Sequence, residues 1–252
     1  MAILRSSNPA FTRGAGFGAP TPGVDELERM YAGSDRLTVD DVVMHTLGLF
    51  AVLGIAAGFG WMLTGGGGSV ALASGLGALA LSFAIGFSRT VRPALIIVFA
   101  ALEGLFVGGI SRIYETAYAG IVAQALLGTG IVFITMLVAY RSGRLRATPR
   151  MRKIVIGTLM GVVGVGLLDL LLRATGVGHV PILNDASPLG ILLSVGILVV
   201  AALQFILDFD FIESAVRAGA PKQEAWRASY GLLVGFVWVY LELLRLLGKL
   251  RQ

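Results

Sequence analysis

Four acidic residues occur within or beside long apolar runs, where a charged side chain is costly. Glu103 lies near the middle of one run, Glu242 lies towards the far end of the last run, and Asp208 and Asp210 end the sixth. A carboxylate at the centre of a bilayer costs about 2.5–3.5 kcal/mol, whereas each leucine there contributes only about 0.3–0.6 kcal/mol. These four residues are therefore candidates for binding a cation or for sensing pH.

Structural roles compete with this interpretation at each position. Glu242 has Arg245 three residues further on, on the same helical face, so a local salt bridge is an alternative. Glu103 could instead form an interhelical ion pair or hydrogen bond, and Arg245 is a candidate partner. Asp208 and Asp210 could mark an interfacial helix end. Yet they stand between aromatic residues, and two carboxylates in such a place could bind a cation or share a proton.

The sequence lacks the residue sets on which most enzymes and cofactor sites depend. It contains no cysteine, and its two histidines, His45 and His179, have no metal-ligand partner at the usual spacing. The glycine-rich segment 64–69 has no lysine and opens no nucleotide-binding unit. A nucleophile–base pair cannot be assembled within the apolar runs. We therefore expect no enzymatic activity and no cofactor.

The composition places most of the chain in lipid. Of its 252 residues, 56% are hydrophobic and only 14% are charged, against about a quarter in soluble domains, and the mean hydropathy is +0.84. The apolar residues form unbroken runs about twice as long as a barrel strand needs, so helices are expected. Seven runs predict an all-α, polytopic bundle of seven transmembrane helices, at about 42–63, 70–88, 93–111, 119–140, 153–172, 188–209 and 228–247.

Capping signals predict where several of these helices begin and end. Thr38 and Asp41 fit a capping box before the first run, and a hydroxyl residue followed by proline precedes both the fifth and the sixth. The sixth helix is expected to continue to Arg217 and to stop at Gly219. Small residues spaced four apart predict close helix packing at three places: Gly54 and Gly58, Gly104 and Gly108, and Gly157 and Gly161.

Basic residues predict the orientation in the membrane. If the N-terminus lies inside and the chain crosses seven times, 15 of the 20 lysines and arginines fall on the inner side. Residues 1–36, rich in Gly, Pro and Ser, are interpreted as a disordered cytoplasmic tail, and residues 37–252 as the seven-helix transmembrane domain. An alternative has six full spans and a re-entrant seventh, which would return the C-terminus to the cytoplasm.

Several segments resemble the bacterial branch of the Bax inhibitor-1 (YccA-like) family. The likeness spans about residues 38–248, and the order and spacing of the segments are more specific than any one of them. The segments are Asp40-Asp41-Val42-Val43, Ala101-Leu102-Glu103-Gly104-Leu105-Phe106, Ile206-Leu207-Asp208-Phe209-Asp210, Arg217-Ala218-Gly219-Ala220-Pro221 and the stretch from Trp238 to Leu247.

This resemblance implies a seven-helix bundle with the last helix in its centre. It also implies a calcium leak that is gated by pH through paired aspartates on the last two helices. Asp208 occupies the place of the first aspartate, and Gly235 stands about where the second is expected. The pair is therefore either absent or rebuilt from Asp208 and Asp210.

We expect a passive, pH-sensitive cation leak channel, with calcium as the ion, in the bacterial plasma (inner) membrane. Asp208 and Asp210 would guard the inner mouth, and Glu103 and Glu242 would line the path. The alternative is a non-conducting regulator of membrane proteolysis or stress survival, which would contact a membrane protein partner through the tail and the basic loop 141–153. The expected partners are the lipid bilayer, calcium or other cations and such a protein, but no nucleic acid.

Overall fold

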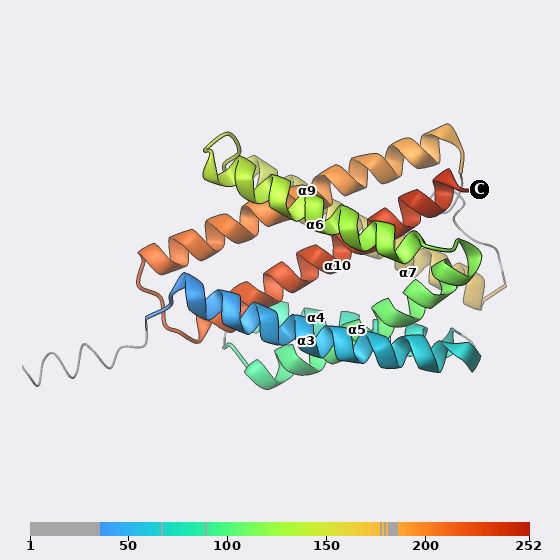
Figure 1. The fold of residues 1–252 in the computed structure, drawn as a ribbon, viewed down its shortest axis with the longest axis horizontal. Helices are drawn as coiled ribbons and strands as arrows, with labels where there is room; N and C mark the ends of the chain where they lie inside the picture. The colour runs from blue at the N-terminus through green and yellow to red at the C-terminus, as the bar shows by residue number, and fades with distance from the viewer. Residues whose placement is uncertain (1–35, 67, 89, 177, 179, 181–185) are drawn as a thin grey trace, which may run out of the picture. The chain divides into compact units, whose positions relative to one another are not determined.

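The computed structural model describes residues 36–66, 68–88, 90–176, 178, 180 and 186–252. These residues form one helical bundle, and within them the only β-type pairing is an isolated bridge between Arg36 and Pro221. The tail predicted at residues 1–36 lies outside the described residues except for Arg36. The helices, labelled in Figure 1, are α3 (Val39–Leu63), α4 (Ser69–Phe87), α5 (Pro93–Ala117), α6 (Ile121–Arg141), α7 (Pro149–Ala174), α9 (Pro188–Arg217) and α10 (Glu224–Leu250).

All seven helices are long and apolar enough to cross a membrane, so the predicted all-α, seven-span bundle is confirmed. Each predicted run corresponds to one helix, although α5 continues to Ala117 and α10 already begins at Glu224. α10 is continuous over 27 residues. A re-entrant segment would need a break within it, so the alternative with six full spans does not fit this chain.

The predicted helix caps are present. The Thr38 hydroxyl accepts from the Asp41 amide at 3.2 Å, and the Asp41 carboxylate accepts from the Thr38 amide, which completes the capping box. Hydroxyls cap α7 and α9 in the same way, each before a proline at the first helical position. α9 ends at Arg217, and Gly219 follows with a φ of +65°, a left-handed conformation that glycine adopts without strain.

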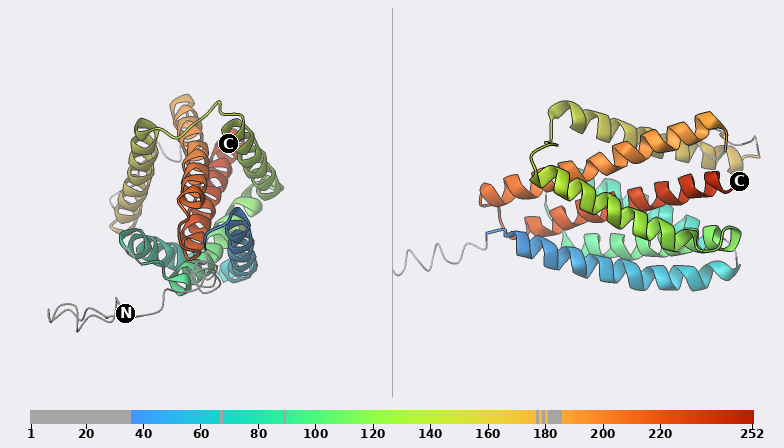
Figure 2. Two further views of the ribbon diagram at one scale, coloured as in Figure 1. Left: turned by 90° about the vertical axis from the view of Figure 1, so that its left-hand side faces the viewer. Right: turned by 45° about the horizontal axis from the view of Figure 1, so that its top comes forward.

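The last helix occupies the centre of the bundle. α10 packs against α3, α5, α6 and α9, and more of its residues are buried than in any other of the seven helices. The end-on view in Figure 2 shows α9 and α10 running through the middle, with α3 and α6 on one side and α4 and α7 on the other. Large apolar side chains such as Met44, Leu127 and Leu192 lie on the outside, more than half exposed, as expected for a surface that faces lipid.

Glycines allow α3 and α5 to lie in backbone contact. A Cβ atom added at Gly108 would lie 2.0 Å from the carbonyl oxygen of Ala57, and one added at Gly60 would lie 2.2 Å from that of Leu105. The predicted close packing is therefore confirmed at Gly104 and Gly108. It is wrong at the other two pairs, Gly54 with Gly58 and Gly157 with Gly161, because a Cβ added there would meet nothing within 4 Å.

Candidate functional site: acidic residues around the last two helices

Asp208 is enclosed between α9 and α10. The residue is only 8% exposed, and its Oδ1 atom accepts a hydrogen bond of 2.9 Å from the side-chain amide of Gln204, one turn earlier on α9. Its Oδ2 atom is buried and has no hydrogen-bond partner among the described residues. An acid held in this way keeps one oxygen available for a further partner, such as a water molecule or an ion.

Two glycines of α10 form the wall opposite Asp208. A Cβ added at Gly231 would lie 3.0 Å from Oδ1, and one added at Gly235 would lie 3.3 Å from Oδ2. Gly231 and Gly235 are four residues apart and therefore lie on one face of α10. The structure thus places Gly235 directly opposite Asp208, where the resemblance expects the second aspartate of a pair.

Asp210 points away from this position. Two residues turn an α-helix by about 200°, so Asp210 lies on another side of α9, where it interacts electrostatically with Tyr140 of α6. The Tyr140 hydroxyl donates a short hydrogen bond to Glu213, which also forms an ion pair with Arg217. Asp208 and Asp210 therefore do not rebuild a facing pair. Glu213, which the sequence analysis missed, belongs to the same polar group as Asp210.

Glu242 lies further along the same face of α10. It is 1% exposed, and its Oε2 atom accepts a hydrogen bond of 2.7 Å from Arg245, the local pair that the sequence predicted as an alternative. Its Oε1 atom is buried and has no hydrogen-bond partner among the described residues. Lys249, one turn beyond Arg245, is also buried and donates to the Gly190 carbonyl and to the Ser194 hydroxyl of α9, both at 2.9 Å.

Glu103 lies on a different helix from the other three acids. It lies on α5, is partly buried, and interacts electrostatically with Tyr230 of α10. Within the described part of the chain it forms no hydrogen bond or ion pair. Arg245 does not serve as its partner, because that guanidinium is bound to Glu242.

The four predicted acids do not form one metal site. Among the described residues there is no group of three or more His, Cys, Asp or Glu side chains that could hold a metal ion. Glu242 lies seven residues beyond Gly235, about 10 Å along the helix, so it is well separated from Asp208.

A third unpartnered polar atom lies between Asp208 and Glu242. The indole nitrogen of Trp238 is buried and has no hydrogen-bond partner within the described ranges. Gly235, Trp238 and Glu242 recur at three and four residues along α10 and so share one helical face. The core of the bundle therefore contains a row of buried polar groups along its central helix whose hydrogen bonds are incomplete among the described residues. The sequence analysis missed Trp238, whose type alone suggests ordinary packing.

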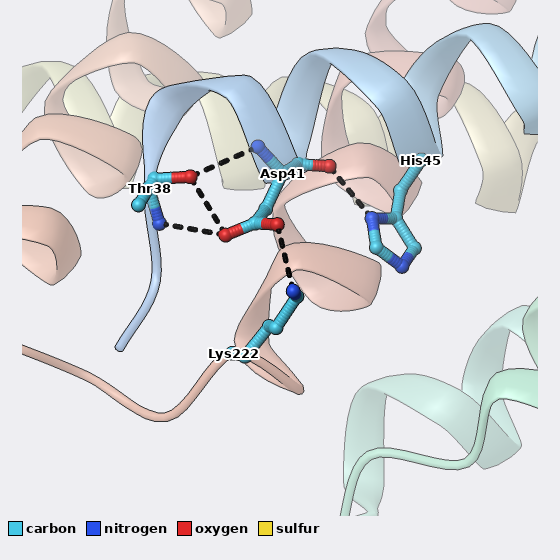
Figure 3. Close-up of polar contacts among 4 residues, drawn as sticks. All are labelled: Thr38, Asp41, His45 and Lys222. Atoms are coloured by element: carbon cyan, nitrogen blue, oxygen red, sulfur yellow. Dashed lines mark hydrogen bonds and ion pairs between the residues drawn. The ribbon is translucent and has the colours of Figure 1, made fainter. Parts of the chain in front are cut away.

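Polar contacts also join the start of α3 to the loop before α10. Figure 3 shows the Lys222 ammonium reaching the Asp41 carboxylate at 3.3 Å, with the Thr38 capping contacts beside it. The backbone of the segment before α3 is fastened to the same loop, because the Leu37 amide donates to the Ala220 carbonyl at 2.8 Å. The end of α9 that carries Asp210 is thereby tied to the first helix.

Comparison with known proteins assigns the family. A search of curated proteins returns no match. The family model described as Bax inhibitor 1 like matches residues 8–252, which is nearly the whole chain and extends beyond the segments that carried the resemblance at both ends. The seven spans and the central last helix agree with what that resemblance implied. The chain belongs to the Bax inhibitor 1 like family of membrane proteins.

Proposed function

We propose that this protein is a passive, pH-sensitive cation leak channel, with calcium as the conducted ion. In this proposal the protein lies in a bacterial plasma membrane with its N-terminus on the cytoplasmic side. Family membership supports the proposal, because the resemblance implies a pH-gated calcium leak controlled by carboxylates on the last two helices. Neither this proposal nor its alternative assigns the chain an enzymatic activity.

Asp208 carries the proposal. Its carboxylate lies in the centre of the bundle with one buried oxygen free of any partner among the described residues. When ionised, such a group attracts a cation into the space between α9 and α10, and when protonated it loses that attraction. Acidic side chains attract cations in the same way in the filters of some cation channels. Flux is therefore expected to change with the protonation of Asp208.

The other end of the same interface is expected to restrict flux. Arg245 neutralises Glu242, and Lys249 is held in place by Gly190 and Ser194 of α9. Lys249 is a buried cationic group, and it repels a further cation in a medium of low dielectric constant. We infer that a cation passes this region only when Arg245 and Lys249 move, so the arrangement in the structure corresponds to a closed channel.

Calcium entry into liposomes tests the proposal. Purified protein is reconstituted with a calcium dye inside the vesicles, and entry is recorded from about pH 5 to 8, the range in which carboxylates with altered environments titrate. Asp208→Asn should change the flux and its pH dependence without unfolding the protein. Asp40→Asn is the matched control, since Asp40 is an exposed acid in the first turn of α3. Equal curves for Asp208→Asn and the unmodified protein would refute the proposal.

A non-conducting regulator remains the alternative function, and one observation favours it. The segment 141–153, which comprises the loop after α6 and the first turn of α7, exposes several basic side chains, among them Arg144, Arg146 and Arg150. These side chains offer a surface for an acidic partner protein. If folded protein produces no flux above that of empty liposomes, this function is preferred. Replacing those three arginines with glutamine should then abolish capture of the membrane protein partner, whereas a channel should keep its flux.

A further inference from the structure

A groove opens on the lipid-facing surface where α3, α5 and α10 meet. It has a volume of about 410 Å³ and is lined by Met44, His45, Gly48, Leu49, Val52, Ile97 and Trp226. This volume is within the range of about 300–1,000 Å³ that is typical of small-molecule sites. Most of the lining is apolar, and Met44 and Ile97 are 67% and 39% exposed at its edge.

The floor of the groove is open at Gly48. A Cβ added to this residue would meet no heavy atom within 4 Å, so the space above it is not filled by the protein. The lining residues of α3, from Met44 to Val52, extend for about 12 Å along the helix. A groove of this length in a transmembrane surface has no water to fill it, and the apolar molecule available there is the acyl chain of a lipid.

Two polar side chains mark one end of the groove. The His45 ring lies edge-on to Trp226, with 4.5 Å between the ring centres. Its Nδ1 atom is 2.6 Å from the Asp41 carbonyl oxygen, which can only accept, so Nδ1 carries the proton. Figure 3 shows the other ring nitrogen pointing away from Asp41. Tryptophan is enriched at the boundary between acyl chains and headgroups.

Two arginines lie at the same end of the bundle. A small neighbouring hollow is lined by Arg92 and Arg227 together with Ser88 and Thr90. Arg227 follows Trp226 directly in the chain and pairs with Glu224 at 3.4 Å, whereas Arg92 is exposed and forms no ion pair with any described residue. Arg92 is therefore a basic side chain at this end of the bundle that can attract an anionic headgroup.

We propose that this groove binds an anionic phospholipid from the leaflet at the end of the bundle where α3 begins. One acyl chain lies along α3 over Gly48 and against Trp226. The phosphate group lies near His45 and is attracted by Arg92. The site is distinct from the acids between α9 and α10, so the proposal does not depend on whether the protein conducts ions.

Trp226 provides a direct readout of the acyl chain. Trp61→Phe and Trp238→Phe leave Trp226 as the only tryptophan of the chain, and phospholipids with brominated acyl chains quench an indole that they contact. Brominated phosphatidylglycerol should quench Trp226 more strongly than brominated phosphatidylcholine at the same mole fraction. Gly48→Phe in this background should reduce the quenching, because the new ring occupies the groove without a clash at its Cβ.

Gly58→Phe is the matched control. Gly58 lies on the same helix, is exposed, and also has nothing within 4 Å of an added Cβ, but it does not line the groove. It should leave the quenching unchanged. Arg92→Gln should lower the preference for the anionic lipid about fivefold, the change expected for one basic residue near an anionic surface.

Four results would overturn the proposal. Unchanged quenching in Gly48→Phe would show that no acyl chain occupies the groove, and equal reductions in Gly48→Phe and Gly58→Phe would show only general lipid contact. Equal quenching by the two lipids would show that the groove does not prefer an anionic headgroup. Quenching that appears only after deletion of residues 1–35 would instead assign the groove to that segment. Circular dichroism of each variant confirms that the helices are intact.

Discussion

The contact between α3 and α5 makes Gly108→Ala a severe test of the fold. The added Cβ would lie 2.0 Å from the oxygen, 2.6 Å from the carbonyl carbon and 2.7 Å from the Cα atom of Ala57. All three are backbone atoms, so no side-chain rotation can relieve the clash. An ordinary contact begins at 3.4 Å. The helices must therefore separate by about 1.4 Å at this point, a gap that forfeits much of the local dispersion energy.

The expected loss of stability follows from two opposing terms. Overpacking of this kind typically costs about 3 kcal/mol at the upper end of its range, and the separation also weakens the neighbouring contacts at Gly60 and Gly104. Alanine in place of glycine returns about 1 kcal/mol through its higher helix propensity. Gly108→Ala should therefore lower the free energy of unfolding by about 2 kcal/mol. For a chain of this size, that corresponds to a fall of about 4–8 °C in Tm.

Unfolding by SDS in mixed micelles, followed by circular dichroism, measures this change. The matched control is Gly54→Ala in α3, where the added Cβ meets nothing within 4 Å. This variant should be as stable as the unmodified protein, or up to about 1 kcal/mol more stable. The reasoning fails if Gly108→Ala unfolds at the same SDS fraction as the unmodified protein. It also fails if Gly54→Ala is destabilised to the same extent as Gly108→Ala.

The same unfolding assay checks three further expectations. Arg245→Met should lower the free energy of unfolding by about 3 kcal/mol, because it leaves the Glu242 carboxylate buried without its partner. This is the low end for a broken buried pair, since Arg245 itself is partly exposed. A loss no larger than that of an exposed pair would contradict this expectation. Lys222→Met should reduce stability slightly at low salt and not at high salt, since its pair with Asp41 is partly exposed; an effect independent of salt would exclude that explanation. Tyr240→Phe should lower the free energy of unfolding by about 1 kcal/mol, because it removes a buried 2.6 Å hydrogen bond to Ser111 of α5. Unchanged stability would show that this bond does not contribute to it.

Most of the fold was predictable because a lipid bilayer admits few kinds of backbone structure. Each apolar run is long enough for one helix and too long for a strand, and the capping residues are local in sequence, as Thr38 and Asp41 illustrate. The pair between Glu242 and Arg245 was predictable for the same reason, since three residues of spacing place them on one face. The caps and this ion pair both depend only on neighbours within about one turn of helix.

Contacts between helices were less predictable because spacing does not say which face meets a partner. The pair at Gly54 and Gly58 has the same spacing as the pair at Gly104 and Gly108, yet it faces open space. Lys249 near the end of the chain resembles a basic residue at a membrane surface, but the antiparallel packing of α9 and α10 buries it against Ser194. Such residues carry no local signal that separates the two outcomes.

Gly235 has a consequence for how this chain can respond to pH. Two facing aspartates repel each other unless they share a proton or separate, so a pair couples two carboxyl groups to one helix contact. With Gly235 opposite Asp208, that repulsion cannot arise, and the backbone of α10 lies directly against the carboxylate. A response that depends on Asp208 should then follow the titration of a single group, spread over about two pH units, rather than the two-step curve of a coupled pair. The shape of the flux curve therefore distinguishes control by Asp208 alone from joint control with the more distant Glu242, whose Arg245 partner already compensates its charge.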